Sequence, residues 1–223
     1  MKFFYVLLLI LLSTGCSVRW SESERVYNVP EKEQPPLPPV VIIDAGHGGK
    51  DRGAHSDKNP RYEEKRLTLQ TAKLVGHYLT KMGHPNTLTR YTDEFIGLKE
   101  RAHLADYSGA LVFVSVHYNS APAKEAHGIE VFYYESKSDH ARSKLSKELS
   151  QDVLSAMIHS TQAKSRGVKH GNLAVIRETH IPAILVEAGF LTHQGEREKI
   201  HTENYRHSIA RGIAKGIDRY LRK

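Results

Sequence analysis

Four side chains that can bind a metal or move a proton stand beside the predicted ends of secondary-structure elements. They are His47 after the apolar run 40–43, Glu64 before a helical pattern, His117 after 111–114 and Glu187 after 184–186. Open sheets of parallel strands collect ligands at the carboxyl ends of their strands. Two histidines and one glutamate form a zinc ligand set that leaves a fourth position for water. The second glutamate can then act as a general base.

His47 lies in a glycine-rich loop, Asp44-Ala45-Gly46-His47-Gly48-Gly49, directly after a predicted strand. Glycines there let the backbone turn sharply and approach another group closely, which leaves the histidine accessible. A phosphate-binding loop is the weaker interpretation, because neither the G-x-G-x-x-G spacing nor a following Gly-Lys-Ser/Thr is present. A lone histidine in such a loop favours a structural role, so the metal-site hypothesis depends on the other three residues.

Both glutamate assignments have alternatives. Glu63 precedes Glu64 and competes with it, either as a ligand or as a first-turn acid that complements the helix dipole. Glu187 ends an apolar run, where burial of a carboxylate is costly unless a cation or a donor meets it. A metal-bound water is one such partner. The structural alternatives are Arg166, Lys169 and Arg177.

The chain from residue 40 alternates short β-branched runs with helical patterns. Strands are predicted near 40–44, 86–90, 111–116, 128–134, 173–176 and 183–187. Helices are predicted at about 67–82, 98–106, 140–158 and 209–220, from apolar residues that recur at helical spacing. This alternation predicts a single α/β domain with a mostly parallel, twisted sheet of about six strands and helices on both faces.

The composition is that of an ordinary globular protein and gives one weak functional hint. The 223 residues are 39% hydrophobic and 26% charged, which suits one domain with a sizeable core. Lys and Arg number 32 against 25 Asp and Glu, a formal net charge of +7, so anionic partners are favoured. No dense basic tract or nucleic-acid motif occurs, and we expect no nucleic-acid binding.

The N-terminus has the features of an export signal. Lys2 is followed by an apolar run from Phe3 to Leu12 and by small residues before Cys16, the only cysteine. The segment resembles a lipoprotein signal, although Ser13 stands where leucine is usual; an ordinary cleaved signal or an uncleaved anchor are the alternatives. We therefore expect a signal peptide at 1–15, lipidation of Cys16, a polar and proline-rich tether at 16–39, and a catalytic domain at 40–223.

At this point several motifs together resemble the zinc-dependent N-acetylmuramoyl-L-alanine amidases of bacterial cell-wall turnover and division. The matching stretches are 41–51, Glu64-Lys65, Thr89-Arg90, 98–101, 114–119, 128–131, 166–169 and 182–190. The resemblance covers essentially all of residues 40–222. It implies a compact α/β domain with a six-stranded sheet, one Zn²⁺, and hydrolysis of the amide between the lactyl group of N-acetylmuramic acid and L-alanine.

The resemblance also implies residue roles. His47, Glu64 and His117 match the zinc ligands, and Glu187 matches the catalytic glutamate. The connection at 53–62 is about two residues longer than is usual in the family, which keeps Glu63 in competition, although the following Lys65 favours Glu64. Asp44 and Asn119 are expected to orient the ligands, because metal ligands need such partners.

A further difference from some family members concerns regulation. Members with division roles insert a long autoinhibitory helix after the strand that corresponds to 128–134, whereas here only 135–165 separate that strand from Arg166. One amphipathic helix at 140–158 uses most of this length, and Leu145, Leu149 and Val153 look like its core face. We expect an open site that needs no activator, and a monomer.

The expected function is therefore cell-wall remodelling or division by a peptidoglycan amidase that is anchored in the bacterial envelope, in the periplasm, through its lipid. Three alternatives stay open: a zinc carboxypeptidase acting on stem peptides, an inactive peptidoglycan-binding lipoprotein, and a surface binder that uses charge alone. The presence of Glu187 argues against the inactive binder.

Overall fold

Apolar β-branched runs build a six-stranded sheet whose central strands are buried on both faces. The computed structural model describes residues 41–56 and 61–223. The strand order is β4-β1-β5-β8-β6-β7. The bounds are β1 Val41–Ala45, β4 Asn86–Leu88, β5 Val112–Asn119, β6 Ile129–Tyr133, β7 Ser165–His170 and β8 Ala183–Phe190. All neighbours are parallel except β6 and β8, which are antiparallel.

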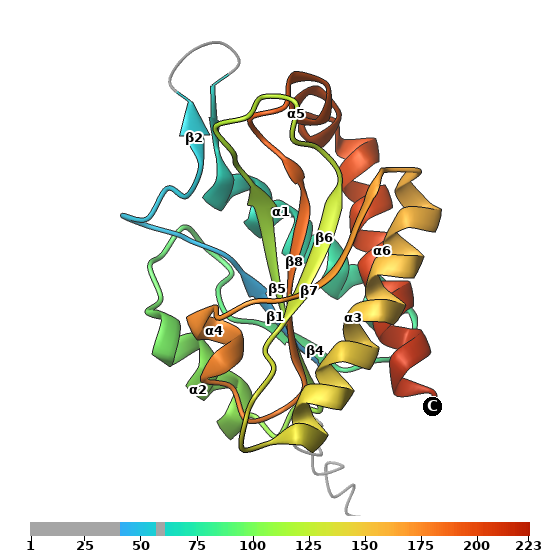
Figure 1. Ribbon diagram of the computed structural model, residues 1–223. Helices are drawn as coiled ribbons and strands as arrows, with labels where there is room; N and C mark the ends of the chain where they lie inside the picture. The colour runs from blue at the N-terminus through green and yellow to red at the C-terminus, as the bar shows by residue number, and fades with distance from the viewer. Residues whose placement is uncertain (1–40, 57–60) are drawn as a thin grey trace, which may run out of the picture. The chain divides into compact units, whose positions relative to one another are not determined.

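Helices cover both faces of this sheet, but to different extents (Figure 1). One face packs against the long helices α1 (Glu64–Lys81), α3 (His140–Thr161) and α6 (Glu203–Leu221), with α5 (Gln194–His201) beside them. The other face packs against the shorter α2 (Leu98–Tyr107) and α4 (Ala174–Arg177). A two-stranded hairpin, β2 (His55–Ser56) and β3 (Tyr62–Glu63), precedes α1.

The thinly covered face changes character along its strands. Ile42, Phe113 and Leu185 belong to the apolar cluster beneath α2 and α4. Two residues further along the same strands, and therefore on the same face, come Asp44, Ser115 and Glu187. In Figure 1, α2 and α4 lie towards the amino-terminal ends of these three strands, and the polar half of the face lies towards their carboxyl ends.

The sheet confirms the predicted fold class and corrects one strand. Residues 174–177 form α4, not a strand, and the sixth strand is β7. A run of four apolar residues cannot distinguish strand from helix by periodicity alone. β7 lies at the edge of the sheet, and its side chains are half-buried or exposed. Its sequence therefore contains no apolar run that would predict a strand.

Helix positions were predicted well, with exceptions at the ends. The C-terminal helix begins earlier than predicted, because the Thr202 side chain accepts a hydrogen bond from the backbone N–H of Tyr205 and caps it. α5 and the β2–β3 hairpin were not predicted. Leu145 was expected in the core but is 41% exposed, whereas Leu149 and Val153 are buried as expected.

The predictions for the N-terminus, namely the signal peptide at 1–15, Cys16 and the tether at 16–39, lie outside the described residues. Within residues 41–56 and 61–223, none of the helices combines the length and the apolar character needed to cross a lipid bilayer.

Candidate metal centre

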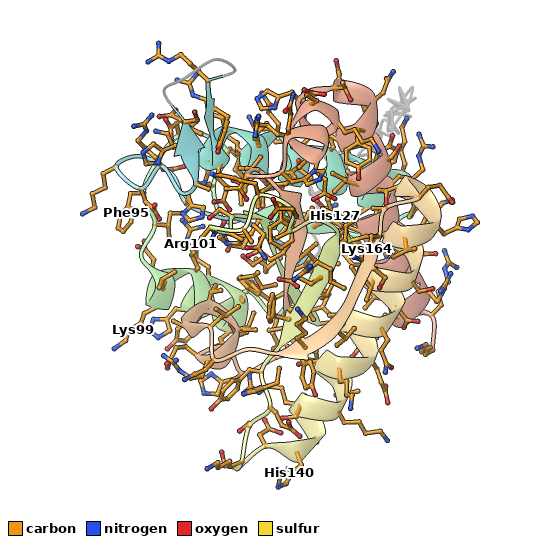
Figure 2. The ribbon with its side chains drawn as sticks, turned by 45° about the horizontal axis from the view of Figure 1, so that its top comes forward. Phe95, Lys99, Arg101, His127, His140 and Lys164 are labelled. Carbon is orange, nitrogen blue, oxygen red and sulfur yellow. The ribbon has the colours of Figure 1, made fainter. Side chains whose placement is uncertain are left out.

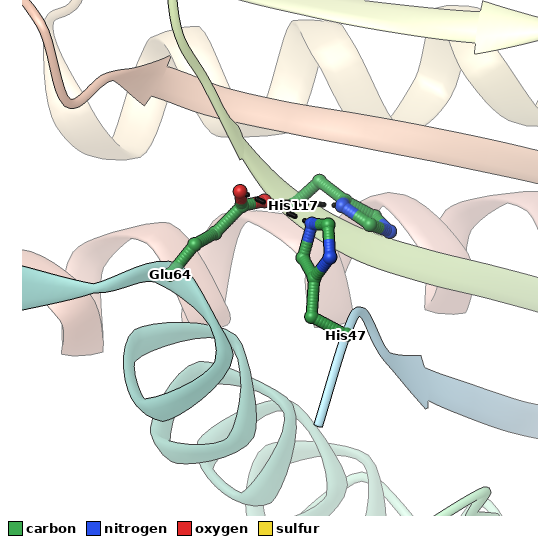
Figure 3. A group of neighbouring side chains, drawn as sticks. All are labelled: His47, Glu64 and His117. Carbon is green, nitrogen blue, oxygen red and sulfur yellow. Dashed lines mark hydrogen bonds and ion pairs between the residues drawn. The ribbon is translucent and has the colours of Figure 1, made fainter. Parts of the chain in front are cut away.

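Three side chains from distant parts of the chain converge at the carboxyl edge of the sheet (Figure 3). His47 follows β1, Glu64 opens α1 and His117 lies near the end of β5. His47 Nε2 is 3.1 Å from Glu64 Oε2, and His117 Nδ1 is 3.1 Å from Glu64 Oε1. One ligand atom from each residue lies within 4.8 Å of the others. The predicted ligand residues therefore meet in space.

The loop that carries His47 is held in an unusual backbone conformation. His47 has φ of 62°, and Gly48 and Gly49 also have positive φ. A side chain at Gly46 would not fit, because its Cβ would lie 2.2 Å from Cε1 of His117. A positive φ costs free energy for a residue with a side chain and persists where surrounding contacts impose it. The glycines thus permit the turn that brings His47 to His117.

Two neighbours hold His47 in that conformation. Its Nδ1 is 2.8 Å from Asp51 Oδ2, and its backbone carbonyl accepts a hydrogen bond of 2.6 Å from Arg101 Nη2. The Asp51 contact leaves Nε2 as the nitrogen that faces Glu64. Sequence reasoning gave neither Asp51 nor Arg101 a role. Both stand in the family-like stretches, but no local pattern indicates which atoms they touch.

Glu64, and not Glu63, joins the cluster. Its carboxylate also accepts hydrogen bonds from the backbone N–H groups of Ala54 and Tyr118. Burial disfavours its ionised form, but the hydrogen bonds and charges of the two imidazoles outweigh this and hold its pKa well below the usual range. Glu63 instead pairs with arginines of the adjacent loop and helix, Arg52 at 2.7 Å and Arg66 at 2.9 Å.

Glu187 lies beside this cluster without a polar partner. It is paired in register with His117 on β5, and its Oε2 is enclosed with no hydrogen-bond partner. Burial, with the nearby carboxylates of Glu64 and Glu130, raises its pKa well above the ordinary value. The three cations considered as its structural partners pair with other carboxylates. Arg166 and Lys169 contact Glu130, and Arg177 contacts Glu178.

The two residues expected to orient ligands have other hydrogen-bond partners. Asp44 accepts hydrogen bonds from Arg101, Ser115 and Thr89. It therefore reaches His47 only through Arg101. Asn119 donates to Glu130 Oε1 at 2.7 Å. Their orienting role stays a prediction.

A hollow of about 220 Å³ opens on the β1 side of the cluster. His47 and His117 line its inner wall, and Phe95, Leu98 and Val175 supply apolar surface. Figure 2 shows Phe95 at the left edge of the domain and, below it, Lys99 of α2, whose side chain points away from the domain. The side chains of His47 and His117 keep exposed fractions of 22% and 17%, so the cluster is accessible from this hollow.

The donor set fits a divalent metal. Tetrahedral zinc with bonds of about 2.0 Å places its ligand atoms about 3.3 Å apart. The two contacts of 3.1 Å are close to this value but go to different oxygens of Glu64, Oε2 for His47 and Oε1 for His117. One ligand atom from each residue lies within 4.8 Å of the others, a spacing at which the three side chains could hold one ion. The buried, unpaired Oε2 of Glu187 is a second indication, because such an atom is costly without a cation or donor nearby.

A sheet covered on both faces, with two histidines at the carboxyl ends of its strands and a glutamate at the start of α1 beside them, is an arrangement that could hold a metal ion in a hydrolase. The N-acetylmuramoyl-L-alanine amidase family model matches residues 41–219. The chain belongs to this family, and it is a peptidoglycan amidase.

Known proteins show the same relationship. The crystal structure of N-acetylmuramoyl-L-alanine amidase from Clostridium difficile 630 is 41% identical, with a TM-score of 0.76, over 82% of this chain and 96% of that one. YqiI of Bacillus subtilis is 36% identical over 81% of this chain and 84% of its own. The probable cell wall amidase LytH of Staphylococcus epidermidis is 29% identical over 82% of this chain but only 58% of its own length.

Proposed function

We propose that this chain hydrolyses the amide between the lactyl group of N-acetylmuramic acid and L-alanine in peptidoglycan stem peptides, with one Zn²⁺ held by His47, Glu64 and His117. The observation that carries this proposal is the convergence of these three side chains beside the unpaired carboxyl of Glu187. When bound, Zn²⁺ would supply a Lewis acid that activates water and polarises the scissile carbonyl.

Glu187 is proposed as the general base. Its carboxylate accepts a proton from the attacking water and returns it to the leaving amine of L-alanine, so that the peptide departs as a neutral amine. Support comes from its position beside His117 and from its enclosed Oε2, which has no hydrogen-bond partner.

His47 and Glu64 are proposed to bind the metal in defined orientations. Asp51 holds His47 through Nδ1 and leaves Nε2 for the metal, while Ala54 and Tyr118 hold the Glu64 carboxylate through their backbone N–H groups. Such partners reduce the freedom that a ligand loses when the metal binds. Asp44 acts one step further out, by fixing Arg101 against the His47 carbonyl.

We also propose an extracytoplasmic location, in the periplasm and on a lipid at Cys16 after removal of 1–15, with 16–39 as a tether and 40–223 as the catalytic domain. The resemblance to a probable cell wall amidase supports the location, and the sequence from Lys2 to Cys16 supports the lipid. The proposed role is wall remodelling or division.

We propose an open site in a monomer without an activator, because α3 packs against α6 and the two histidines retain solvent contact.

The test is product analysis of the purified protein with a muramyl peptide, with and without chelator, beside Glu187→Ala. We expect a peptide with free N-terminal L-alanine, lost with chelator, restored by zinc and lost in the variant. Products cut at a peptide bond with the lactyl amide intact would support a carboxypeptidase instead. Activity that appears only after another protein is added would contradict the proposed open site.

A further inference from the structure

A row of polar side chains continues across the sheet beyond the cluster of His47, Glu64 and His117. Glu187 on β8 is paired in register with His117 on one side and with Glu130 on β6 on the other. Paired residues of neighbouring strands point to the same face and lie close together. Glu130 is 4% exposed, and it brings the row to β7, which carries Arg166 and Lys169.

A bulge in β7 brings both cations to the same face. Ile129 pairs with Ser165 and Val131 pairs with Val168, so three steps along β7 match two steps along β6. Gly167, with φ of 85°, lies in this irregular stretch. In a regular strand, residues three apart such as Arg166 and Lys169 would point to opposite faces. β-bulges re-aim side chains in this way and are frequent next to active sites.

Glu130 holds both cations in place, but its single negative charge balances only one of their two positive charges. Its Oε2 accepts hydrogen bonds from Arg166 Nε at 2.8 Å and Lys169 Nζ at 2.5 Å, and its Oε1 accepts one from Asn119. Two positive charges therefore face one carboxylate. The side chains of Arg166 and Lys169 are 30% and 40% exposed, so both side chains are accessible from solvent. An ammonium has three donors and a guanidinium five, and both residues can bind a further anion.

We propose that Arg166 and Lys169, fixed by Glu130, form a subsite for a carboxylate on the peptide side of the scissile amide. This inference rests on the proposed function. The subsite takes the free α-carboxylate of the residue that follows L-alanine, a glutamate linked through its γ-carboxyl. The stem peptide then runs from the metal cluster across β8 and β6 towards β7, and the lactyl-sugar part lies on the side of the hollow at Phe95.

The distances suit this direction. Strands are about 4.8 Å apart, so β6 lies roughly 10 Å from β5 and its His117. A residue adds at most about 3.6 Å to an extended chain, and the carboxylate of the second residue therefore reaches about 7 Å from the scissile bond. The Arg166 and Lys169 side chains cover the remaining gap. On the opposite side, Phe95, Leu98 and Val175 offer an apolar wall. Of the two cations there, Arg101 is paired with the buried Asp44 and Lys50 lies over the Phe95 ring.

The experiment compares two muramyl tetrapeptides that differ only in whether this α-carboxylate is free or amidated. We expect the wild-type protein to cleave the free form with a kcat/KM at least about tenfold higher, mainly through KM, because a hydrogen bond to a charged group is lost in the amide. In Lys169→Gln, which leaves Arg166 in place, the ratio should fall clearly below the wild-type value. Because the ratio is taken within one preparation, a misfolded fraction cancels.

Three controls complete the test. Lys169→Arg should keep the preference, and Lys215→Gln, which removes an exposed charge on α6, should keep the wild-type ratio. Calorimetry of both peptides with Glu187→Gln protein gives the same comparison without turnover. A wild-type ratio near one, or a ratio that Lys169→Gln leaves unchanged, overturns the subsite. Failure to cleave the lactyl amide in either peptide overturns the proposed function, and the calorimetric ratio then decides on the subsite separately.

Discussion

Glu187 lies directly beside His117 in the register of β5 and β8, and its Oε2 is enclosed without a hydrogen-bond partner. This carboxyl therefore lies next to the proposed metal site, and its Oε2 makes no hydrogen bond to another residue. Metal binding and proton transfer are therefore assigned to different side chains.

Glu187→Gln is expected to lower kcat by about 10² to 10⁴ while the protein still binds one zinc, because a general base contributes about this factor and the three ligands are untouched. Steady-state kinetics and metal analysis of the same preparation check this. Glu198→Gln, an exposed residue of α5, serves as the control. Loss of the metal together with activity would instead make Glu187 a ligand.

Asp51→Asn is expected to weaken zinc binding by about 10- to 100-fold, because its carboxylate holds Nδ1 of His47 at 2.8 Å. Competition with a chromogenic chelator measures the affinity. Asp106→Asn is the matched control, because Asp106 also lies 2.8 Å from a histidine Nδ1, that of the exposed His180. Equal affinities in the two variants would show that the Asp51 contact does not affect the metal.

Arg101→Met is expected to destabilise the fold by about 3 to 5 kcal/mol, because it leaves the buried carboxylate of Asp44 without its cation. The lost hydrogen bond to the His47 carbonyl should also loosen the loop after β1. Urea unfolding gives the free energy, with Lys99→Met on the solvent side of the same helix as the control. A change below about 1 kcal/mol would mean that Asp44 finds another partner.

The pH dependence of stability should include a contribution from Asp44. Burial raises the pKa of this carboxyl, but Arg101, Ser115 and Thr89 outweigh it, so the folded pKa lies below the ordinary value. A depressed pKa stabilises the fold above the unfolded pKa of about 3.9, and this stability is lost as the pH falls through the folded pKa. The difference in unfolding free energy between wild type and Asp44→Asn should therefore shrink below about pH 4. Urea titrations at pH 6 and pH 3 test this, and a constant difference would contradict it.

Zinc should raise the thermal midpoint of the protein, since a ligand that binds only the folded state stabilises it by about 2.7 kcal/mol at 100 times its dissociation constant. Chelator should reverse the shift, and His117→Ala should remove it. Differential scanning calorimetry at several zinc concentrations measures the effect. The same shift in His117→Ala would indicate that zinc binds somewhere else.

The sequence predicted the fold through elements whose residues carry a local signal. β1, β5, β6 and β8 are apolar runs, and the core faces of α1, α3 and α6 recur at helical spacing. β7 was missed because an edge strand with half-buried polar side chains has no such run. The hairpin of β2 and β3 and the short α4 depend on their surroundings more than on their own residues.

The site was predicted to a similar degree. The sequence singled out His47, Glu64, His117 and Glu187 because each stands at the end of a strand or the start of a helix, where an α/β sheet gathers its ligands. The structure brings them together, and their roles stay a prediction. The choice between Glu63 and Glu64 needed the structure, since adjacent residues have almost the same local pattern.

By itself, the sequence determined that strands alternate with helices and that metal-binding side chains occur at the strand ends. Only the tertiary structure decided which side chains meet: Asp51 and Arg101 with His47, and Arg166 and Lys169 with Glu130. The physical reason is register. One extra residue in a bulge sends a side chain to the other face of a sheet, and contacts between residues far apart in the chain exist only after the strands have paired.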